Sequence, residues 1–296
     1  MKQNIPVQLN SGVPPINSYS KLLNSFMFHE MEAYSNRFLY LNKDSLSNYR
    51  KKWVSDPFHS WSRQWEYPYV YQMICSYLQR ASNTSEIKIL DAGSGVTFFP
   101  YYIDFVFKRV RVDCCDLDGE FGHVFSAINN RLQKSITFHN MDIKHLQSES
   151  DLYEIVYCIS VLEHADDYEK VLREFHRVLK PEGLLILTFD VSIDGFSDIS
   201  IDRAKTLIGL IESYFTPLES MSLDALDKLH NSDLFLTTDY IKKFNKHLLP
   251  WSCSPSTLSQ IIANSFNYSM ILKIINRIRH PNPNSSIYCA QYQKII

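Results

Sequence analysis

A short apolar run, Ile87 to Leu90, leads directly into the turn Asp91-Ala92-Gly93-Ser94-Gly95, and this junction is the strongest constraint on the fold. Glycines at the carboxyl end of a strand let the backbone reverse sharply, and they let a ligand approach it closely. The helix that follows offers amide donors at its N-terminus. Because open α/β sheets bind nucleotides at the end of the first strand, the junction predicts such a sheet with a ligand site there.

The chain after this junction alternates between strand-like and helix-like segments, which implies a parallel sheet built from right-handed crossovers. Five strands are expected, at 87–90, 110–115, 135–140, 153–160 and 184–189. Helices are expected at 99–108 and 119–133, and a third contains Val171, Leu172, Phe175, Val178 and Leu179 at helical spacing. Asp166 or Asp167 caps this third helix, and Pro181-Glu182-Gly183 stops it.

The segments on either side of this alternation have a different character. Residues 17–80 are rich in aromatic residues and helix formers, with Pro68 suited to a helix start, and the polar stretch 81–86 reads as a linker. Beyond Asp190 we expect helices at about 201–215, 223–230, 239–248 and 255–266, the last after a Ser254 cap. The run SIYCAQYQKI, after a turn at 281–284, suits a final edge strand. The predicted organisation is a helical N-terminal cap at 1–85 and a main domain at 86–296, with a helical insertion at about 195–266.

Composition limits the classes of partner. The 296 residues carry a formal net charge of -2 and no dense run of Lys and Arg, which disfavours nucleic acid as a substrate. The six cysteines show no CxxC spacing for zinc, and four lie in strand-like runs where buried free thiols are expected. No apolar leader opens the sequence, and no stretch approaches the roughly 18 apolar residues of a membrane span. We therefore expect a cytoplasmic protein.

The residues of the turn favour one kind of ligand over another. A dinucleotide fingerprint places a third glycine where Phe98 stands, and Asp91 precedes the first glycine by two positions. A carboxylate there suits a cationic or amino-acid ligand better than a pyrophosphate, although an isolated Gly-x-Gly also occurs in ordinary turns. Asp116, 21 residues after Gly95, is placed to bind ribose hydroxyls, while Asp118 either assists it or caps the next helix. Asp142, after the third strand, is placed to accept from an adenine amino group or faces water.

Taken together, the ordered series DAGSG, CDLD, NMDI, YEIVYCISVLEH and LKPEGLLILTFD resembles the class I S-adenosylmethionine-dependent methyltransferases, in their ubiquinone-biosynthesis-like, type 11 branch. The resemblance covers about residues 88–190 and implies a Rossmann-like, seven-stranded, mostly parallel sheet. It implies S-adenosyl-L-methionine as the cofactor, held by residues from four strand ends. These are Asp91, Ala92, Gly93, Ser94, Gly95, Thr97, Asp116, Leu117, Met141, Asp142, Ile143, Ser160 and Val161. Thr97 stands where the family often has a third glycine, and it either bonds the cofactor carboxylate or caps the next helix.

The resemblance also implies an in-line methyl transfer, for which the protein supplies alignment and a base. His164 and Asp190 are the candidate bases; the alternative for His164 is a structural loop residue and for Asp190 a turn residue. The aromatic cluster between Trp61 and Tyr69 offers Trp65, Tyr67 and Tyr69 as acceptor-binding residues, with plain core as the alternative. No metal is expected, because Asp190 does not stand beside an Asn.

The predicted function is methyl transfer to an oxygen or nitrogen of a small molecule, such as a sugar, a lipid precursor or a secondary metabolite. Two other functions remain open at this point. One is a catalytically inactive cofactor-binding or scaffolding subunit with the same fold, and the other is a polyamine-forming enzyme on the same sheet. Neither the acceptor nor the oligomeric state follows from the sequence.

Overall fold

The computed structural model describes residues 7–49, 57–81, 86–196, 199–219, 223–230, 233–244, 248 and 283–295. The predicted helix at 255–266, its Ser254 cap and Cys253 lie outside these residues. Eight strands form one sheet: β1 Ile87–Ala92, β2 Val110–Asp116, β3 Thr137–Asn140, β4 Tyr153–Ile159, β5 Leu179–Ser192, β6 Ile199–Ser200, β7 Phe215–Pro217 and β8 Ser285–Lys294. The helices are α1 Ile16–Leu23, α2 Phe26–Leu41, α4 Arg63–Arg80, α5 Phe99–Val106, α6 Phe121–Leu132, the 3-10 turn η1 Leu162–His164, α7 Tyr168–Val178, α8 Ile201–Glu212, α9 Asp224–Asp227 and α10 Thr238–Phe244.

The strand order is β3-β2-β1-β4-β5-β8-β7, and the short β6 pairs with β5 outside this path. Strands β1 to β5 pair in parallel, whereas β8 pairs antiparallel with both of its neighbours. The expected Rossmann-like, mostly parallel sheet is therefore confirmed. Since β1, β2, β4 and β5 run in the same direction, the residues after their last positions meet at one edge of the sheet.

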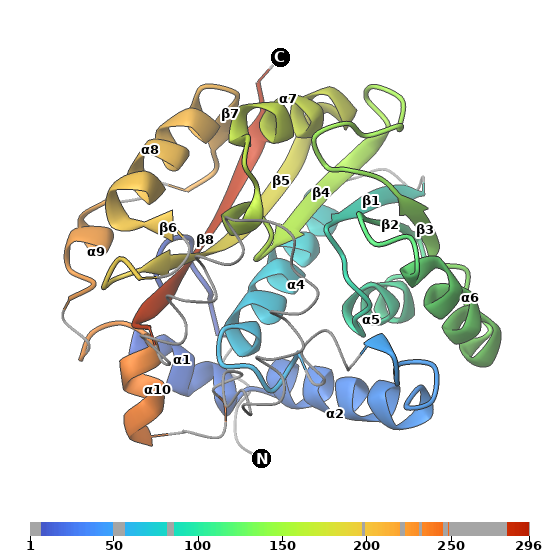
Figure 1. Ribbon diagram of the computed structural model, residues 1–296, viewed down its shortest axis with the longest axis horizontal. Coiled ribbons are helices and arrows are strands. Elements are labelled where there is room, and N and C mark those ends of the chain that lie inside the picture. Colours follow the sequence, from blue (N-terminus) through green and yellow to red (C-terminus); the bar gives the residue numbers. More distant parts are fainter. Residues whose placement is uncertain are drawn as a thin grey trace, which may run out of the picture.

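Alternate residues of the central strands pack on opposite faces of the sheet. In β1, Ile89 joins an apolar cluster with residues of α2, α4, α5 and α6, while Leu90 joins a second cluster with residues of α7 and α8. Figure 1 shows α7 and α8 on the upper side of the sheet, with α4 and α5 crossing below it. The fold is thus a sheet covered by helices on both faces, as its doubly buried parallel strands require.

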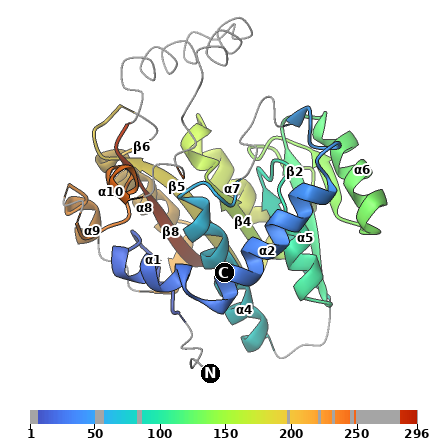
Figure 2. The same cartoon turned by 90° about the horizontal axis from the view of Figure 1, so that it is seen from below.

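The N-terminal helices form a layer of their own on one of these faces. Helix α4 packs on the sheet, and α2 lies across the outer side of α4 and α5 (Figure 2). Rings hold this layer together: Tyr67 stacks on Phe99, with 4.8 Å between centroids, and Phe38 contacts Tyr101 at 5.2 Å. The division at residue 85 between cap and main domain stays a prediction.

Three local predictions are wrong. SIYCAQYQKI was expected at an edge, but β8 lies between β5 and β7, and its buried positions are continuous rather than alternating, as in an internal strand. Helix α4 begins at Arg63 and contains Pro68, which was expected to start it. Phe215 belongs to β7 rather than to the preceding helix, so α8 is an ordinary crossover helix between two strands of the sheet.

Candidate active site

The turn after β1 depends on two glycines with left-handed backbone. Gly93 has a φ of 76° and Gly95 a φ of 51°. A side chain on Gly93 would meet Val161 of the loop after β4, with only 2.5 Å between a built Cβ and Val161 Cγ2. The turn is therefore packed closely against the end of β4, at a place where only glycine fits.

Asp116 at the end of β2 holds this turn in place. The backbone N–H of Gly95 donates to Asp116 Oδ2 at 3.0 Å, and the N–H of Asp118 donates to Oδ1 at 3.3 Å. Burial raises the pKa of the Asp116 carboxyl, while these backbone donors oppose that shift. Asp118 accepts from the N–H of Glu120 at 3.1 Å in the turn before α6, but it does not cap that helix, whose N-cap residue is Glu120.

Asp91 is a buried carboxyl at the first position of the turn. Its residue is only 5% exposed. Burial raises the pKa of Asp91 to about 8; the nearby Tyr157 hydroxyl opposes this shift, and the charge of Asp116 adds to it. A carboxyl with such a pKa is largely neutral at pH 7, and a cation placed beside it would favour its ionised form. The position therefore suits a positively charged ligand group.

An apolar surface lies beside Asp116. Leu117 is 69% exposed, which is unusual for a large hydrophobic side chain, while Met141 and Ile143 are buried. The N–H of Met141 donates to Asp116 O at 3.1 Å, which joins the end of β3 to the end of β2. Asp142 accepts from the N–H of Lys144 at 2.9 Å. The exposed Leu117 next to the Asp116 carboxylate offers an apolar contact for a ligand.

A buried hydrogen-bond network joins α4 to the ends of β4 and β5. The Ser160 hydroxyl donates to Glu66 Oε1 at 2.6 Å, and the Thr188 hydroxyl donates to the same oxygen. Arg63 Nη1 donates to the other oxygen of Glu66 and to Ser160 Oγ at 2.6 Å. Glu66 has no exposed surface, and Ser160 has a left-handed φ of 47°. The sequence placed Arg63 and Glu66 in an aromatic cluster without assigning them a role; their charge within that cluster was the one available signal.

Tyr49 is a further residue of the site that the sequence did not indicate. Its hydroxyl would be 2.7 Å from a Cβ built on Gly95, and its ring contacts Phe121 with 5.3 Å between centroids. Burial is the main cause that raises the pKa of Tyr49 to about 12, and a hydrogen bond from Val96 opposes it. The N-terminal layer therefore covers the glycine turn directly.

The predicted catalytic and acceptor residues lie in different surroundings. His164 is exposed in η1, while Asp190 is partly buried in β5 and acts electrostatically on Arg63. Tyr67 lies near Asp91 and Arg63, whose charges both act on its hydroxyl. Trp65 is buried beside Cys289, and the Tyr69 hydroxyl bonds to Ser11 Oγ at 2.8 Å. Tyr67 is thus the aromatic candidate that the fold brings next to the turn.

The remaining predicted positions complete the turn. The Ser94 hydroxyl donates to Gly95 O at 2.9 Å, and the N–H of Phe99 donates to Thr97 Oγ1 at 3.4 Å, while the N-cap residue of α5 is Phe98. Ala92 is buried as the last residue of β1. Within the described part of the chain, no group of three or more His, Cys, Asp or Glu side chains could hold a metal ion. No described helix is long and apolar enough to cross a membrane.

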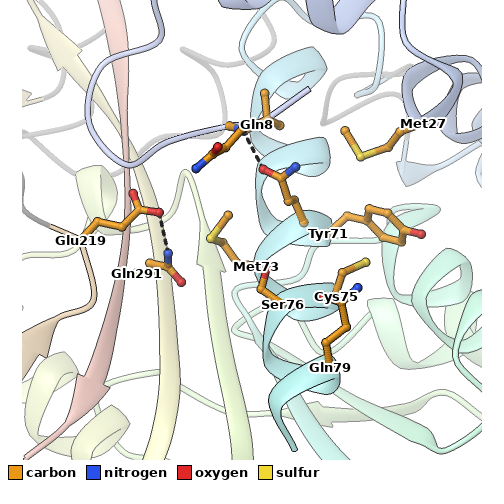
Figure 3. A pocket seen from close by; sticks show the side chains of 11 residues that line it. Gln8, Met27, Tyr71, Met73, Cys75, Ser76, Gln79, Glu219 and Gln291 are labelled. Atoms are coloured by element: carbon orange, nitrogen blue, oxygen red, sulfur yellow. Dashed lines mark hydrogen bonds between the residues drawn. The ribbon is translucent and has the colours of Figure 1, made fainter. Parts of the chain in front are cut away.

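A separate cavity of about 360 Å³ lies between the lower half of α4 and β8. Figure 3 shows Glu219 and Gln291 together on one side of it, joined by a bond of 2.9 Å from Gln291 Nε2 to Glu219 Oε1. On its opposite wall Gln72 accepts from the N–H of Leu9 at 2.7 Å. The contact of Leu9 with Gln72 binds the N-terminal segment to α4, and the cavity includes none of the glycine-turn residues.

The residues at the sheet edge fit S-adenosylmethionine. Buried Asp91 matches the ammonium of the amino-acid end, Asp116 matches a ribose, and exposed Leu117 matches an adenine face. The left-handed glycines leave room for a ligand to lie along the backbone between these groups.

Comparisons with known proteins agree with this fit. Residues 90–187 match the family model described as a methyltransferase domain. The tRNA U34 carboxymethyltransferase of Sulfurimonas denitrificans is 24% identical over 141 residues, which cover 47% of this chain and 47% of that protein. The ubiquinone biosynthesis O-methyltransferase of Rickettsia akari is 24% identical over 40% of this chain and 46% of its own length. The chain thus matches less than half the length of these relatives.

Among solved structures, the [4+2]-cyclase SpnF has a TM-score of 0.53 with 14% sequence identity, covering 83% of this chain and 86% of its own. This likeness shows the fold. Sheet order, glycine turn and family match together define a class I S-adenosylmethionine-dependent methyltransferase domain. Residues 90–187 are thus a methyltransferase domain of that class, whose cofactor is S-adenosylmethionine.

Proposed function

We propose that this protein transfers a methyl group from S-adenosylmethionine to an oxygen or nitrogen atom of a small-molecule acceptor. The observation that carries the proposal is the order of groups along the sheet edge: buried Asp91, then Asp116, then exposed Leu117. This order matches the amino-acid, ribose and adenine parts of the cofactor. The sulfur then falls near the end of β4, where Ser160 and Val161 lie.

The bound cofactor supplies an activated methyl group on a good leaving group, so the protein's own task is to align the acceptor and accept its proton. We propose Asp190 as the base in preference to His164. Asp190 lies at the end of β5, within electrostatic range of Arg63 on α4, and so faces the helix that covers this edge. His164 is exposed on η1. Tyr67 is the aromatic side chain proposed to contact the acceptor.

The class of acceptor rests on charge and on which residues surround it. A net charge of -2 and the absence of a basic run give no general attraction to a phosphate backbone. The relatives named for tRNA modification match this chain over less than half of their length, so their acceptor enters here as a competing outcome. The solved structure of similar fold is a [4+2]-cyclase, so a reaction other than methyl transfer is a second competing outcome.

The test has two stages. Calorimetry with S-adenosylhomocysteine measures cofactor binding, and absence of heat and of thermal stabilisation would refute the proposal. Transfer of label from methyl-labelled S-adenosylmethionine is then measured against small hydroxyl and amine acceptors, and separately against unmodified tRNA. Label on tRNA alone would replace the proposed acceptor class, and binding without any transfer would favour a cofactor-binding subunit. Asp190→Asn should depress transfer without weakening S-adenosylhomocysteine binding, whereas His164→Ala should leave both unchanged.

A further inference from the structure

We propose that Arg63 binds the carboxylate of the cofactor's amino-acid end, and that Glu66 is the positioning residue that aims it. This inference rests on the proposed function, because it assigns a partner to one part of the same cofactor. It adds a group from the N-terminal layer to a site whose known motifs all lie on the sheet.

Arg63 makes its hydrogen bonds through one of its three side-chain nitrogen atoms. A guanidinium has five N–H donors, and the bonds that Arg63 makes use Nη1 alone, toward Glu66, Ser62 and Ser160. Among the described residues, Nε and Nη2 have no acceptor. The Arg63 side chain is 24% exposed, so part of it remains accessible to a ligand. The Nε and Nη2 edge is the one that fits a carboxylate with two parallel hydrogen bonds.

Charges of both signs act on the side chains near Arg63. The hydroxyls of Tyr49 and Tyr67 each lie within electrostatic range of both Asp91 and Arg63. An acidic group and a basic group therefore border the same small space beside the glycine turn. An amino-acid zwitterion has the complementary pair, an ammonium for Asp91 and a carboxylate for Arg63. With Asp91 holding the ammonium, Arg63 is the cation within reach of the carboxylate.

Glu66 holds the Arg63 guanidinium in a fixed orientation. Glu66 is fully buried, and both of its carboxylate oxygens are occupied, one by Arg63 and the other by Ser160 and Thr188. Because Ser160 directly follows β4 and Thr188 lies in β5 opposite Ile159, the guanidinium is fixed relative to the sheet before any ligand binds. An orientation fixed in advance reduces the entropic cost of binding. Arg63 and Glu66 thus act as one device.

The test separates parts of the ligand. S-adenosylhomocysteine, its decarboxylated analogue and 5′-methylthioadenosine, which lacks the amino-acid end, are titrated calorimetrically into the full chain. For Arg63→Gln we expect affinity for S-adenosylhomocysteine to fall about 10- to 100-fold, the loss of a charge-assisted bidentate contact. Affinity for the decarboxylated analogue and for 5′-methylthioadenosine should change less than about twofold, since neither carries the carboxylate.

Two further variants show whether a loss of affinity comes from misfolding or from the loss of a ligand contact. Arg63→Lys keeps a charge for Glu66 without the planar fork, so it should keep the thermal stability and still lose affinity for S-adenosylhomocysteine. Glu66→Gln should reduce the preference for S-adenosylhomocysteine over 5′-methylthioadenosine, a ratio that a merely structural role would leave unchanged. Arg80→Gln, at the exposed end of the same helix, is the matched control and should bind all three ligands like the wild type.

Three results would overturn the inference. If Arg63→Gln loses affinity equally for all three ligands, Arg63 maintains the structure of the site and does not bind the carboxylate. Unchanged S-adenosylhomocysteine affinity with a raised KM for an anionic acceptor assigns the open edge to the acceptor instead. If the wild-type chain binds 5′-methylthioadenosine but gains nothing from the amino-acid end, the carboxylate has no partner here. Failure of the proposed function is distinct, because then the wild type binds none of the three ligands.

Discussion

Cofactor binding should release a proton from Asp91. The number of protons released per ligand bound follows from the burial of that residue. Burial raises the pKa of Asp91 from 3.8 to about 8 in the ligand-free protein. At pH 7 a group with that pKa is about 0.9 protonated. A ligand ammonium beside the carboxyl lowers its pKa on binding, so we expect release of about 0.9 proton per S-adenosylhomocysteine bound at pH 7.

The same linkage fixes how affinity depends on pH. Because the ionised form binds the ammonium, affinity should rise with pH up to the ligand-free pKa of Asp91. Between about pH 6 and pH 7.5 the expected increase is about 25-fold, or about 1.9 kcal/mol. The window stops there because the ligand's own amino group begins to lose its proton near pH 8.

Calorimetry in buffers of different ionisation enthalpy measures the proton count directly. Asp91→Asn should bind S-adenosylhomocysteine more weakly, without proton release and with flat pH dependence. 5′-Methylthioadenosine is the control for Asp116, whose raised pKa would affect binding of the adenosine part as well. Wild-type affinity that stays constant across this window, with no proton released, would refute the assignment of Asp91 to the ammonium.

Asp91 should also make the ligand-free protein less stable as pH rises. A raised folded-state pKa means that the folded chain holds the proton more tightly than the unfolded chain. The resulting contribution is favourable at low pH and is lost progressively as pH rises from about 4 toward 8. Asp91→Asn should remove this slope from a plot of melting temperature against pH. A slope shared equally by wild type and variant would place its origin elsewhere.

Three other substitutions test separate parts of the site. Gly93→Ala should abolish S-adenosylhomocysteine binding and lower the melting temperature, because its Cβ would meet Val161 at 2.5 Å in a left-handed backbone; Gly209→Ala, in α8 with nothing within 4 Å, is the control and should raise stability by about 0.5–1 kcal/mol. Asp116→Asn should weaken S-adenosylhomocysteine and 5′-methylthioadenosine alike, by at least about 10-fold, since both contain the ribose; a loss for one ligand only would contradict the ribose assignment. Leu117→Ser should weaken both about fivefold in titrations while leaving the melting temperature unchanged, because 69% of that residue is already exposed; unchanged affinity would remove Leu117 from the adenine contact.

The sheet and its glycine turn were predictable because their signals are local. The alternation of strands with helices between Ile87 and Phe189 implies a parallel sheet, and the spacing of Asp116 from Gly95 places both at one edge. The position of β8 was not predictable in this way. Its place between β5 and β7 depends on backbone partners far away in the chain, such as Leu187 with Ala290, which no periodicity in the strand itself reveals.

The sequence did not indicate the site residues that precede the glycine turn, Tyr49 and Glu66, for the same physical reason. Glu66 and Ser160 are separated by 94 residues, and Tyr49 meets Gly95 across about half that interval, so no motif of fixed spacing connects them. Within its own helix, Glu66 reads as one charge among aromatic residues. Its role becomes visible only when Ser160 and Thr188 are seen to donate to the same buried oxygen.

This division bears on which part of the chain selects the acceptor. The matched methyltransferase domain spans residues 90–187, so it contains Asp91, Asp116 and Ser160 but neither Tyr49 nor Arg63. Residues inside the domain account for cofactor binding, a task common to the whole class. The side chains that close the space over β4 and β5 come instead from α4 and the segment before it. We therefore expect the N-terminal layer to select the acceptor, and exchange of this layer between two such proteins should transfer acceptor preference with it.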